Sequence, residues 1–217
     1  MNALLISTLT LAAYLIGSIP FGLLLAKTKG LDIRKQGSGN IGATNVLRCL
    51  GKPLGITCFV LDVFKGFLPA FLFPMLEIYN ASGVTGSAGL HENFPSIGIL
   101  FGIFAILGHN FPVFLKFKGG KGVATTAGVL IGIAPLAVVL GLITWTLVFY
   151  VSGYVSLGSI IASLVVILTG WIRIGHYGLV TTIALTLLGS LSIYRHRSNI
   201  QRLRNGTENK FEKKSRK

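Results

Sequence analysis

The sequence predicts an all-α integral membrane protein with about seven transmembrane helices, some of them short or broken. Hydrophobic residues occupy 52% of the 217 positions and charged residues only 12%, which is far more apolar than a typical soluble domain. The apolar residues form long runs, and the first run has no charged residue over 25 positions, 2–26. The cations gather in polar segments between such runs. This pattern indicates helices in a bilayer rather than one buried globular core.

The first half of the chain contains three predicted helices. Residues 2–26 are long enough to span a bilayer and lack the basic start of a signal peptide, so we expect a retained first helix. Pro53 opens a second helix that extends to about Leu76, because proline suits the first helical turn. Residues 96–115 form the third. The polar connection 77–95 contains no Lys or Arg, and we expect it outside.

The second half of the chain is interrupted at Pro135, inside the apolar stretch 123–150. Six crossings that begin outside would leave the C-terminus outside, whereas two helices divided at this proline give seven crossings and a cytoplasmic C-terminus. The stretch before Pro135 is short for a full crossing, so we expect one half-helix buried in protein. Residues 155–172 and 177–193 form the last helices. We predict a single membrane-embedded domain over residues 1–217, with a polar basic tail at about 209–217.

The distribution of positive charge predicts the orientation in the membrane. The net charge is +14, and eighteen of the twenty Lys and Arg residues lie within 27–52, 116–121 and 195–217. An excess of cations on one side is typical of cytoplasmic segments. We therefore expect the N-terminus outside, and the C-terminus and the three basic segments in the cytoplasm. The same distribution argues for the lipid bilayer as the partner and against nucleic acid.

The stretch 37–48, GSGNIGATNVLR, is the strongest candidate for a binding site. Its glycines allow positive φ and close approach of the backbone to a ligand. Its short polar side chains and successive amides could bind an anion, and an arginine supplies a planar fork for phosphate. These residues are Gly37, Ser38, Gly39, Asn40, Gly42, Thr44, Asn45 and Arg48. The spelling G-x-G-x-x-G also matches a dinucleotide fingerprint, but that motif requires a strand before it, and here a membrane-length run precedes it.

Two later basic segments could complete a phosphate site with this loop. Residues 116–122, KFKGGKG, combine three lysines with three glycines and do not match a Walker A loop, because glycine follows Lys121. Residues 195–208 follow the last predicted helix, and a helix there would place His196 and Asn199 on one face, with Arg197 adjacent. We interpret the three segments as one site for two phosphorylated ligands at the membrane surface.

Polar residues inside the apolar runs have structural interpretations. Asp62 and Lys65 are three positions apart in the second helix, and we expect an ion pair near its cytoplasmic end. His109 is expected to be a hydrogen-bonded structural group. Cys49 and Cys58 are too few for a disulfide framework and are expected to be structural thiols.

Along these three segments the chain resembles the bacterial acyl-phosphate-dependent glycerol-3-phosphate acyltransferases, the PlsY family. GSGNIGATNVLR resembles the first motif of that family, KFKGGKGVAT the second, and HRSNIQRLRNGTE the third. The similarity extends from the first helix to Glu208. It implies a seven-helix enzyme of the bacterial cytoplasmic (inner) membrane. The enzyme would transfer a fatty acyl group from acyl phosphate to glycerol 3-phosphate and form lysophosphatidic acid and phosphate, the first acylation of phospholipid synthesis.

The resemblance also implies which residues form the site. By motif match, the essential residues are Ser38, Arg48, Lys121, His196 and Asn199. The substrate- and phosphate-binding set is Gly37, Gly39, Asn40, Gly42, Thr44, Asn45, Lys118, Gly119, Gly120, Gly122, Arg197 and Glu208. No cofactor is expected, because acyl phosphate is already activated. No metal is expected either, because the sequence has six carboxylates and no clustered ligands.

Three alternatives remain open from the sequence. The proton of the glycerol hydroxyl could pass to His196 or, as we prefer, to the acyl-phosphate oxygen, and a Ser38 acyl-enzyme is a third route. An organic-phosphate transporter is the rival function, but it predicts cations along a path to both faces, and here they collect on one. A soluble enzyme that produces acyl phosphate could dock on the basic face, since acyl phosphates are labile.

Overall fold

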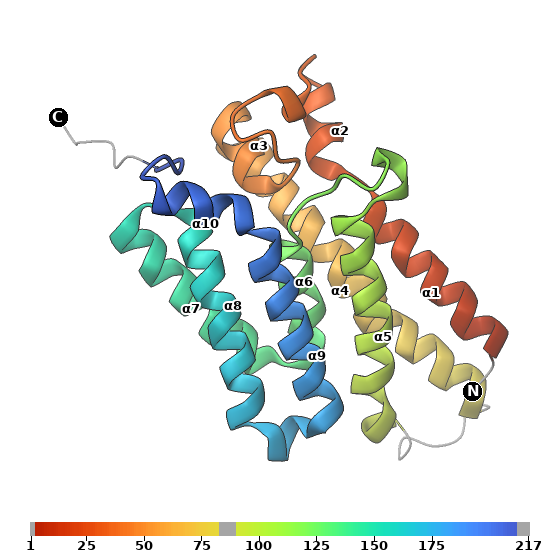
Figure 1. Ribbon diagram of the computed structural model, residues 1–217. Helices are drawn as coiled ribbons and strands as arrows, with labels where there is room; N and C mark the ends of the chain where they lie inside the picture. Colours follow the sequence, from red (N-terminus) through yellow and green to blue (C-terminus); the bar gives the residue numbers. More distant parts are fainter. Residues whose placement is uncertain (1–2, 83–89, 212–217) are drawn as a thin grey trace. The chain divides into compact units, whose positions relative to one another are not determined.

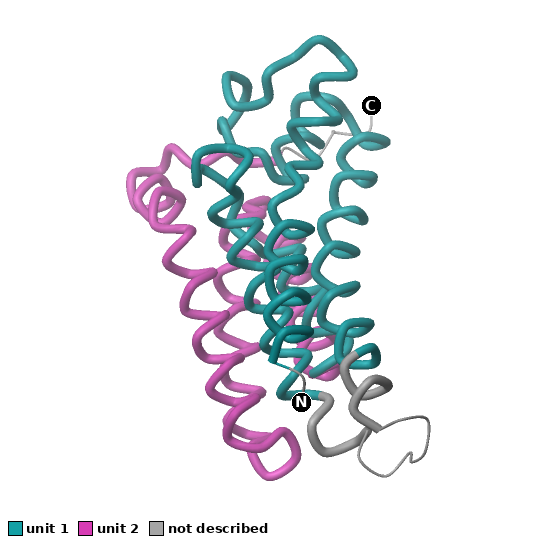
Figure 2. Tube along the Cα trace, turned by 90° about the vertical axis from the view of Figure 1, so that its right-hand side faces the viewer, with its two compact units in different colours: residues 1–133 teal, residues 134–217 magenta. Residues whose placement is uncertain are grey.

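The computed structural model describes residues 3–82 and 90–211, and every regular element within them is a helix. The chain forms two compact units, Met1–Ile133 and Ala134–Lys217, which Figure 2 draws in different colours. The prediction of an all-α protein is confirmed for the described residues. The prediction of one functional domain over both units is a separate matter and stays a prediction.

Unit 1 consists of long helices with short helical pieces gathered at one end (Figure 1). Its elements are α1 (Ala3–Ser18), α2 (Phe21–Lys27), η1 (Ile33–Lys35), α3 (Ala43–Leu50), α4 (Lys52–Ser82), α5 (Leu90–Asn110), η2 (Val113–Leu115) and α6 (Val123–Ile133). The C-terminal ends of α1 and α5 and the N-terminal ends of α4 and α6 lie at the end that carries the short pieces. The chain therefore presents its two polar loops at one end of the unit.

Glycines allow the long helices of unit 1 to pack closely. A Cβ added at Gly17 of α1 would meet the backbone of Ala105 on α5, and one at Gly108 of α5 would meet Tyr14. Gly66 of α4 is equally close to the backbone of Thr125 on α6. Lipid tails are as apolar as the side chains, so close backbone approach and van der Waals contact drive helix association in a membrane. Larger residues at these positions would force the helices apart.

Unit 2 consists of three long helices and a short one: α7 (Pro135–Ser152), α8 (Val155–Ile172), α9 (Ile174–Arg195) and α10 (Arg197–Arg204). Gly153 takes φ +75° in the turn between α7 and α8. Between α8 and α9, the Ser163 hydroxyl donates to the Ser192 hydroxyl over 2.9 Å. The helix α10 follows α9 directly, at the end of the unit where α7 joins α8 (Figure 1).

The sequence predicts about seven crossings, whereas the described residues contain five or six full-length spans, and α6 is a shorter apolar helix. The helices also differ from the predicted ones in their ends. Among the described residues, five helical segments are long and apolar enough to cross a membrane, and a sixth arises if α1 and α2, bent by 41°, count as one span. The predicted break at Pro135 is confirmed, because α6 ends at Ile133 after 11 residues and α7 begins at Pro135. The helices α4 and α5 reach into the predicted connection 77–95, of which residues 83–89 lie outside the described residues.

Candidate active site

The loop before α3 is held together by the side chain of one asparagine. Asn45 is 1% exposed, and its Nδ2 donates to the carbonyls of Ile33, Gln36 and Asn40 at 3.2, 3.0 and 2.8 Å. Its Oδ1 accepts the Ser38 N–H at 2.9 Å. A buried amide that satisfies several backbone groups rigidifies the segment around it. Asn45, predicted to bind substrate, thus has its amide directed into the loop.

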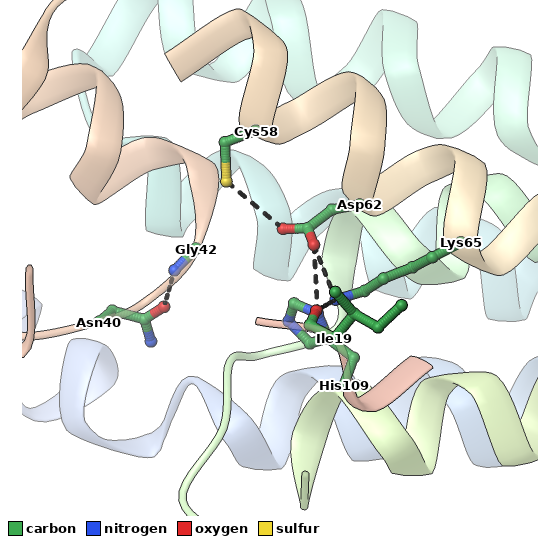
Figure 3. A network of polar contacts seen from close by, with 7 residues as sticks. All are labelled: Ile19, Asn40, Gly42, Cys58, Asp62, Lys65 and His109. Atoms are coloured by element: carbon green, nitrogen blue, oxygen red, sulfur yellow. Dashed lines mark hydrogen bonds and ion pairs between the residues drawn. The ribbon is translucent and has the colours of Figure 1, made fainter. Parts of the chain in front are cut away.

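The glycines of this loop differ in their backbone conformation. Gly37 and Gly39 take φ +57° and +70°, which residues with a Cβ rarely adopt. A Cβ at Gly37 would also meet the side chains of Asn45 and Cys49. Gly42 precedes α3 with an ordinary φ of −79°, and its N–H donates to the Asn40 side chain at 2.8 Å (Figure 3). Two of the predicted positions therefore shape the loop through their backbone.

Several backbone amides of this loop already donate to protein acceptors. The N–H groups of Ser38 and Gly42 bond to side chains, and that of Gly39 donates to the Gln36 carbonyl at 2.9 Å. The successive amides expected to bind an anion are thus engaged at these three positions. The Ser38 side chain is exposed, and Arg48 on α3 is half-buried. The Ser38 hydroxyl and the Arg48 guanidinium are groups of this segment whose chemistry suits a phosphate.

We expect Asn45→Asp to disrupt this loop. The substitution keeps the shape of the side chain but places a carboxylate oxygen against three carbonyls, where the amide now donates. Unsatisfied buried acceptors cost about 1–3 kcal/mol each. The melting temperature in detergent should fall. Thr44→Val replaces a half-buried neighbouring side chain by one of similar volume and is the matched control for stability. An Asn45→Asp protein with parental stability would contradict the role assigned to Asn45.

The second loop, residues 111–122, contains two non-glycine residues with positive φ. Lys116 and Phe117 take φ of 51° and 63°. For a bulky residue this is an outlier that the surroundings must hold in place. The N–H of Phe117 donates to the Pro112 carbonyl at 2.9 Å. Lys116 and Lys118 are exposed and Lys121 is half-buried, so the strained turn presents cations at the surface.

The three glycines of this loop pack against the end of α5. The Gly120 N–H donates to the His109 carbonyl at 3.1 Å. A Cβ at Gly119 or Gly120 would meet the backbone or the ring of His109, and one at Gly122 (φ +81°) would meet the Asn110 side chain. The sequence suggests open backbone for phosphate at these glycines. In the structure, their lack of a side chain serves close packing of the loop on α5.

The two loops of unit 1 share a small apolar core. Buried side chains of α2, η1, the first loop, α3 and α4 form it, and Leu115 of η2 packs against it from the second loop. The buried members are Leu23, Ala26, Ile33, Ile41, Val46 and Cys58. Ser38, Arg48, Lys118 and Lys121 are therefore presented by loops anchored to one cluster. The structure brings the first and second predicted segments together at one end of unit 1.

Behind this core lies a buried polar network (Figure 3). Asp62 Oδ1 lies 2.8 Å from Lys65 Nζ, with both side chains 3% exposed, which confirms the predicted ion pair. The same Oδ1 is 3.7 Å from His109 Nδ1. Lys65 Nζ also donates to the Ile19 carbonyl at 2.8 Å. The spacing of Asp62 and Lys65 indicates their pairing, but no local pattern links either residue to Ile19 or His109.

In unit 2, His196 lies at the junction of α9 and α10 and is 2% exposed. Its Nδ1 is 2.8 Å from the Ser192 carbonyl. A carbonyl only accepts, so we assign the proton to Nδ1, and in the neutral ring Nε2 then carries the lone pair. His196 can thus accept a hydrogen bond or a proton at Nε2. Arg197, next to it, is exposed and its guanidinium stacks 4.8 Å from the centre of the Tyr194 ring.

Glu208 ties the segment after α10 to the rest of unit 2. Its carboxylate accepts from Asn199 Nδ2 at 2.7 Å and from the Ser156 hydroxyl at 2.8 Å. Arg202 Nε donates to its other oxygen at 2.8 Å. Burial opposes ionisation, but hydrogen bonds from Asn199, Ser156 and Arg202 outweigh it and hold the pKa of Glu208 below its usual value. Glu208, predicted to bind substrate, here anchors Asn199 and α10 to α8.

We expect Glu208→Gln to lower stability at neutral pH, because hydrogen bonds to a charged group contribute about 1.5–3 kcal/mol each. A carboxylate with a depressed folded-state pKa stabilises above its unfolded value of 4.5, and this contribution is lost as the pH falls through the folded value. The melting temperature of the parent should therefore decline more steeply below pH 4.5 than that of Glu208→Gln. Parallel melting curves over this pH range would contradict the assignment.

Residues for a metal site do not gather in the described part of the chain, where no three His, Cys, Asp or Glu side chains could hold one ion. The third predicted segment, with His196, Arg197, Asn199 and Glu208, lies in unit 2. Its joining to the other two segments in one site stays a prediction. The roles of Ser38, Arg48, Lys121, His196 and Asn199 also stay predictions.

Comparison with known proteins gives one consistent result. The family model described as glycerol-3-phosphate acyltransferase matches residues 7–206. The glycerol-3-phosphate acyltransferase of Geotalea daltonii is 44% identical, over 94% of this chain and 97% of the relative, and that of Aquifex aeolicus is 41% identical with the same coverage.

Solved structures agree with these relatives. The crystal structure of PlsY (YgiH), an integral membrane glycerol 3-phosphate acyltransferase, in its glycerol 3-phosphate form, superposes with a TM-score of 0.81 at 40% identity. It covers 95% of this chain and 96% of that chain. The lysophosphatidic acid form gives a TM-score of 0.79 at 39% identity. The resemblance noted in the three motifs is thereby confirmed, and the chain is an integral, multi-pass membrane protein.

Proposed function

Since the chain belongs to the glycerol-3-phosphate acyltransferase family, we propose that it transfers a fatty acyl group from acyl phosphate to glycerol 3-phosphate. It is an acyltransferase that makes lysophosphatidic acid, and the acyl-phosphate donor is the proposed part. The groups that line the site support acyl phosphate as the donor. Ser38, Arg48, Lys118 and Lys121 stand on two loops anchored to one apolar core. Such a site suits two substrates that each carry a phosphate close to the reacting groups, whereas the phosphates of a CoA or carrier-protein thioester lie far from the reacting carbonyl.

The reaction needs no covalent enzyme intermediate. The primary hydroxyl oxygen of glycerol 3-phosphate attacks the carbonyl carbon of the acyl phosphate, and the bond from that carbon to the phosphate oxygen breaks. Phosphate leaves with the electron pair, and the hydroxyl proton is released. An activated donor of this kind leaves the enzyme mainly the task of holding two anions in reacting geometry.

Charge and positioning are the contributions we assign to the essential residues. Two phosphates repel, and the repulsion grows in surroundings of low dielectric constant. Arg48 and Lys121 would offset it, with Lys118 and Arg197 as further cations. The exposed Ser38 hydroxyl would donate to a phosphate or to the developing oxyanion. Asn45, Glu208 and the glycines at 119 and 120 would act indirectly, because their described contacts are to the protein itself.

We prefer the leaving phosphate as the proton acceptor. His196 could accept a proton at Nε2, but its described Nδ1 partner is a backbone carbonyl, which stabilises an imidazolium less than a carboxylate would. His196 would then bind and orient the glycerol hydroxyl, while an oxygen of the acyl phosphate takes the proton.

The basic loops would face the cytoplasm of a bacterial cell, with the N-terminus outside the cytoplasmic membrane. The cation-rich segments 27–52 and 116–121 lie at the same end of unit 1, as an excess of cations on one side requires. A soluble acyl-phosphate-producing enzyme would dock on this basic face. Co-purification in mild detergent tests the docking, and its loss when Lys116 and Lys118 become glutamate would identify the surface.

The donor assignment is tested by acyl transfer to labelled glycerol 3-phosphate, with purified protein in lipid nanodiscs. Palmitoyl phosphate, palmitoyl-CoA and a palmitoyl thioester of acyl carrier protein are compared side by side. Lysophosphatidic acid should form from the acyl phosphate only, and Ser38→Ala should abolish it. Equal rates with a thioester would contradict the donor that we propose.

A further inference from the structure

A buried polar network lies behind both loops of unit 1, and we propose that Asp62 and Lys65 position these loops for substrate. The inference rests on the proposed function, because it assigns the phosphate-binding loops as the parts that are positioned. The contacts described for these two residues are to Ile19, Phe21, Cys58, His109 and each other. Lys65 acts through the backbone carbonyl of Ile19, and Asp62 acts through Lys65 and the ring of His109 (Figure 3).

Lys65 fixes the break between α1 and α2. Its Nζ donates to the carbonyl of Ile19, in the two-residue gap between the helices, at 2.8 Å. The same carbonyl accepts the Phe21 N–H at 3.1 Å, and the ammonium group adds a charge-assisted hydrogen bond to it. The Phe21 ring lies 5.5 Å from the same Nζ. The Lys65 side chain therefore holds both sides of the bend.

The direction of α2 in turn determines where the glycine loop lies. Gly22 of α2 packs so closely on the Ile41 carbonyl that a Cβ there would overlap it. Leu23 and Ala26 of α2 share the apolar core with Ile33 and Ile41, on either side of the loop. A change in the angle of α2 would thus be passed to residues 37–42 by direct contact.

Asp62 connects Lys65 to the second loop. Its Oδ1 holds Lys65 at 2.8 Å and lies 3.7 Å from Nδ1 of His109. The backbone carbonyl of His109 accepts the Gly120 N–H, and its ring packs against Gly120. Asp62 Oδ2 is 3.8 Å from the Sγ of Cys58, a member of the apolar core. One carboxylate therefore contacts α4, α5 and the core beneath the first loop.

Packing alone does not account for this network. Charged side chains within membrane helices are costly, and a buried pair could be replaced by apolar residues of similar volume without loss of stability. Retention of a buried pair is better explained when it selects one arrangement among several. Here the arrangement selected is the relative placement of residues 37–48 and 116–122.

The test removes both charges together, so that neither is left unpaired. In the double variant Asp62→Asn with Lys65→Met, we expect the KM for glycerol 3-phosphate to rise about tenfold or more, since small displacements of positioning groups have effects of this size. Lys65→Arg keeps the ion pair and a donor, and its KM should stay within about threefold of the parent. Phe101→Leu, in a separate buried cluster of unit 1, is the control for lost stability.

A second measurement needs no substrate. Hydrogen exchange of the amides in 37–48 and 116–122 should accelerate in the double variant, and exchange in α8 of unit 2 should not. This separates the inference from the proposed function, because a parent that makes no lysophosphatidic acid from acyl phosphate would overturn the latter alone.

Three results would overturn the positioning role. The first is a folded double variant with parental KM and parental exchange in both loops. The second is an equal rise in KM in Phe101→Leu at the same melting temperature. The third is failure to recover the double variant as a folded protein while Lys65→Arg is normal, since the pair would then serve the fold.

Discussion

Arg48→Ala is expected to lower kcat/KM by about 10²–10³-fold, the loss seen when one group that stabilises developing charge is removed. Arg48 is a half-buried residue of α3, directly after the loop that presents Ser38. Without its guanidinium, two phosphates would meet with one fewer cation between them. A melting curve recorded beside the kinetics separates a loss of activity from a loss of stability. The measurement is initial-rate kinetics with both substrates varied, in nanodiscs.

The control for Arg48→Ala is Arg34→Ala, which removes the same charge from the same basic segment. Arg34 is exposed and pairs with Asp32 at 2.8 Å, so its guanidinium is already committed. We expect Arg34→Ala to retain activity within about threefold. Arg48→Lys should recover only part of the loss, because an ammonium cannot form the paired hydrogen bonds of a guanidinium. Equal losses of activity in Arg34→Ala and Arg48→Ala would contradict the specific role of Arg48, because the activity would then depend only on the total positive charge of the segment.

His196→Ala is expected to act on binding rather than on chemistry. If the acyl phosphate takes the proton, the KM for glycerol 3-phosphate should rise about 10²-fold, while kcat at saturation falls less than about tenfold. Removal of a general base would instead lower kcat by 10²–10⁴-fold. The buried position of His196 makes a melting curve necessary beside the kinetics. The exposed His176 in the same unit provides the control, His176→Ala, which should behave as the parent.

A large fall in kcat at saturating glycerol 3-phosphate would contradict the substrate-assisted route. His196 would then be the base, with Nδ1 held by the Ser192 carbonyl and Nε2 directed to substrate. An acylated Ser38 trapped from the parent enzyme would contradict both routes.

The sequence predicts the helices well because membrane spans are encoded locally. The break at Pro135 and the pairing of Asp62 with Lys65 follow from a single proline and a three-residue spacing, and both are confirmed. The ends of α4 and α5 are not predicted, because both helices continue through polar residues of the connection 77–95.

The inner contacts of the site could not be predicted from the sequence. Asn45 and Glu208 lie within motifs that resemble a phosphate site, and their residue types suit a ligand as well as a loop. Only the fold shows that their side chains accept and donate within the protein. Likewise, the Lys65 contact with Ile19 joins residues 46 positions apart, and the left-handed Phe117 depends on its hydrogen bond to Pro112. Such features follow from tertiary contacts rather than from a pattern of residues.

The central claim is that one acyl phosphate and one glycerol 3-phosphate give one lysophosphatidic acid and one phosphate. The most direct test is a single-turnover experiment in nanodiscs, with ³²P in the acyl phosphate and ¹⁴C in glycerol 3-phosphate. We expect labelled phosphate and labelled lysophosphatidic acid to appear together, in equal amounts and at the same rate, and neither without glycerol 3-phosphate. Phosphate release without lysophosphatidic acid, or the lipid product without phosphate release, would contradict the claim.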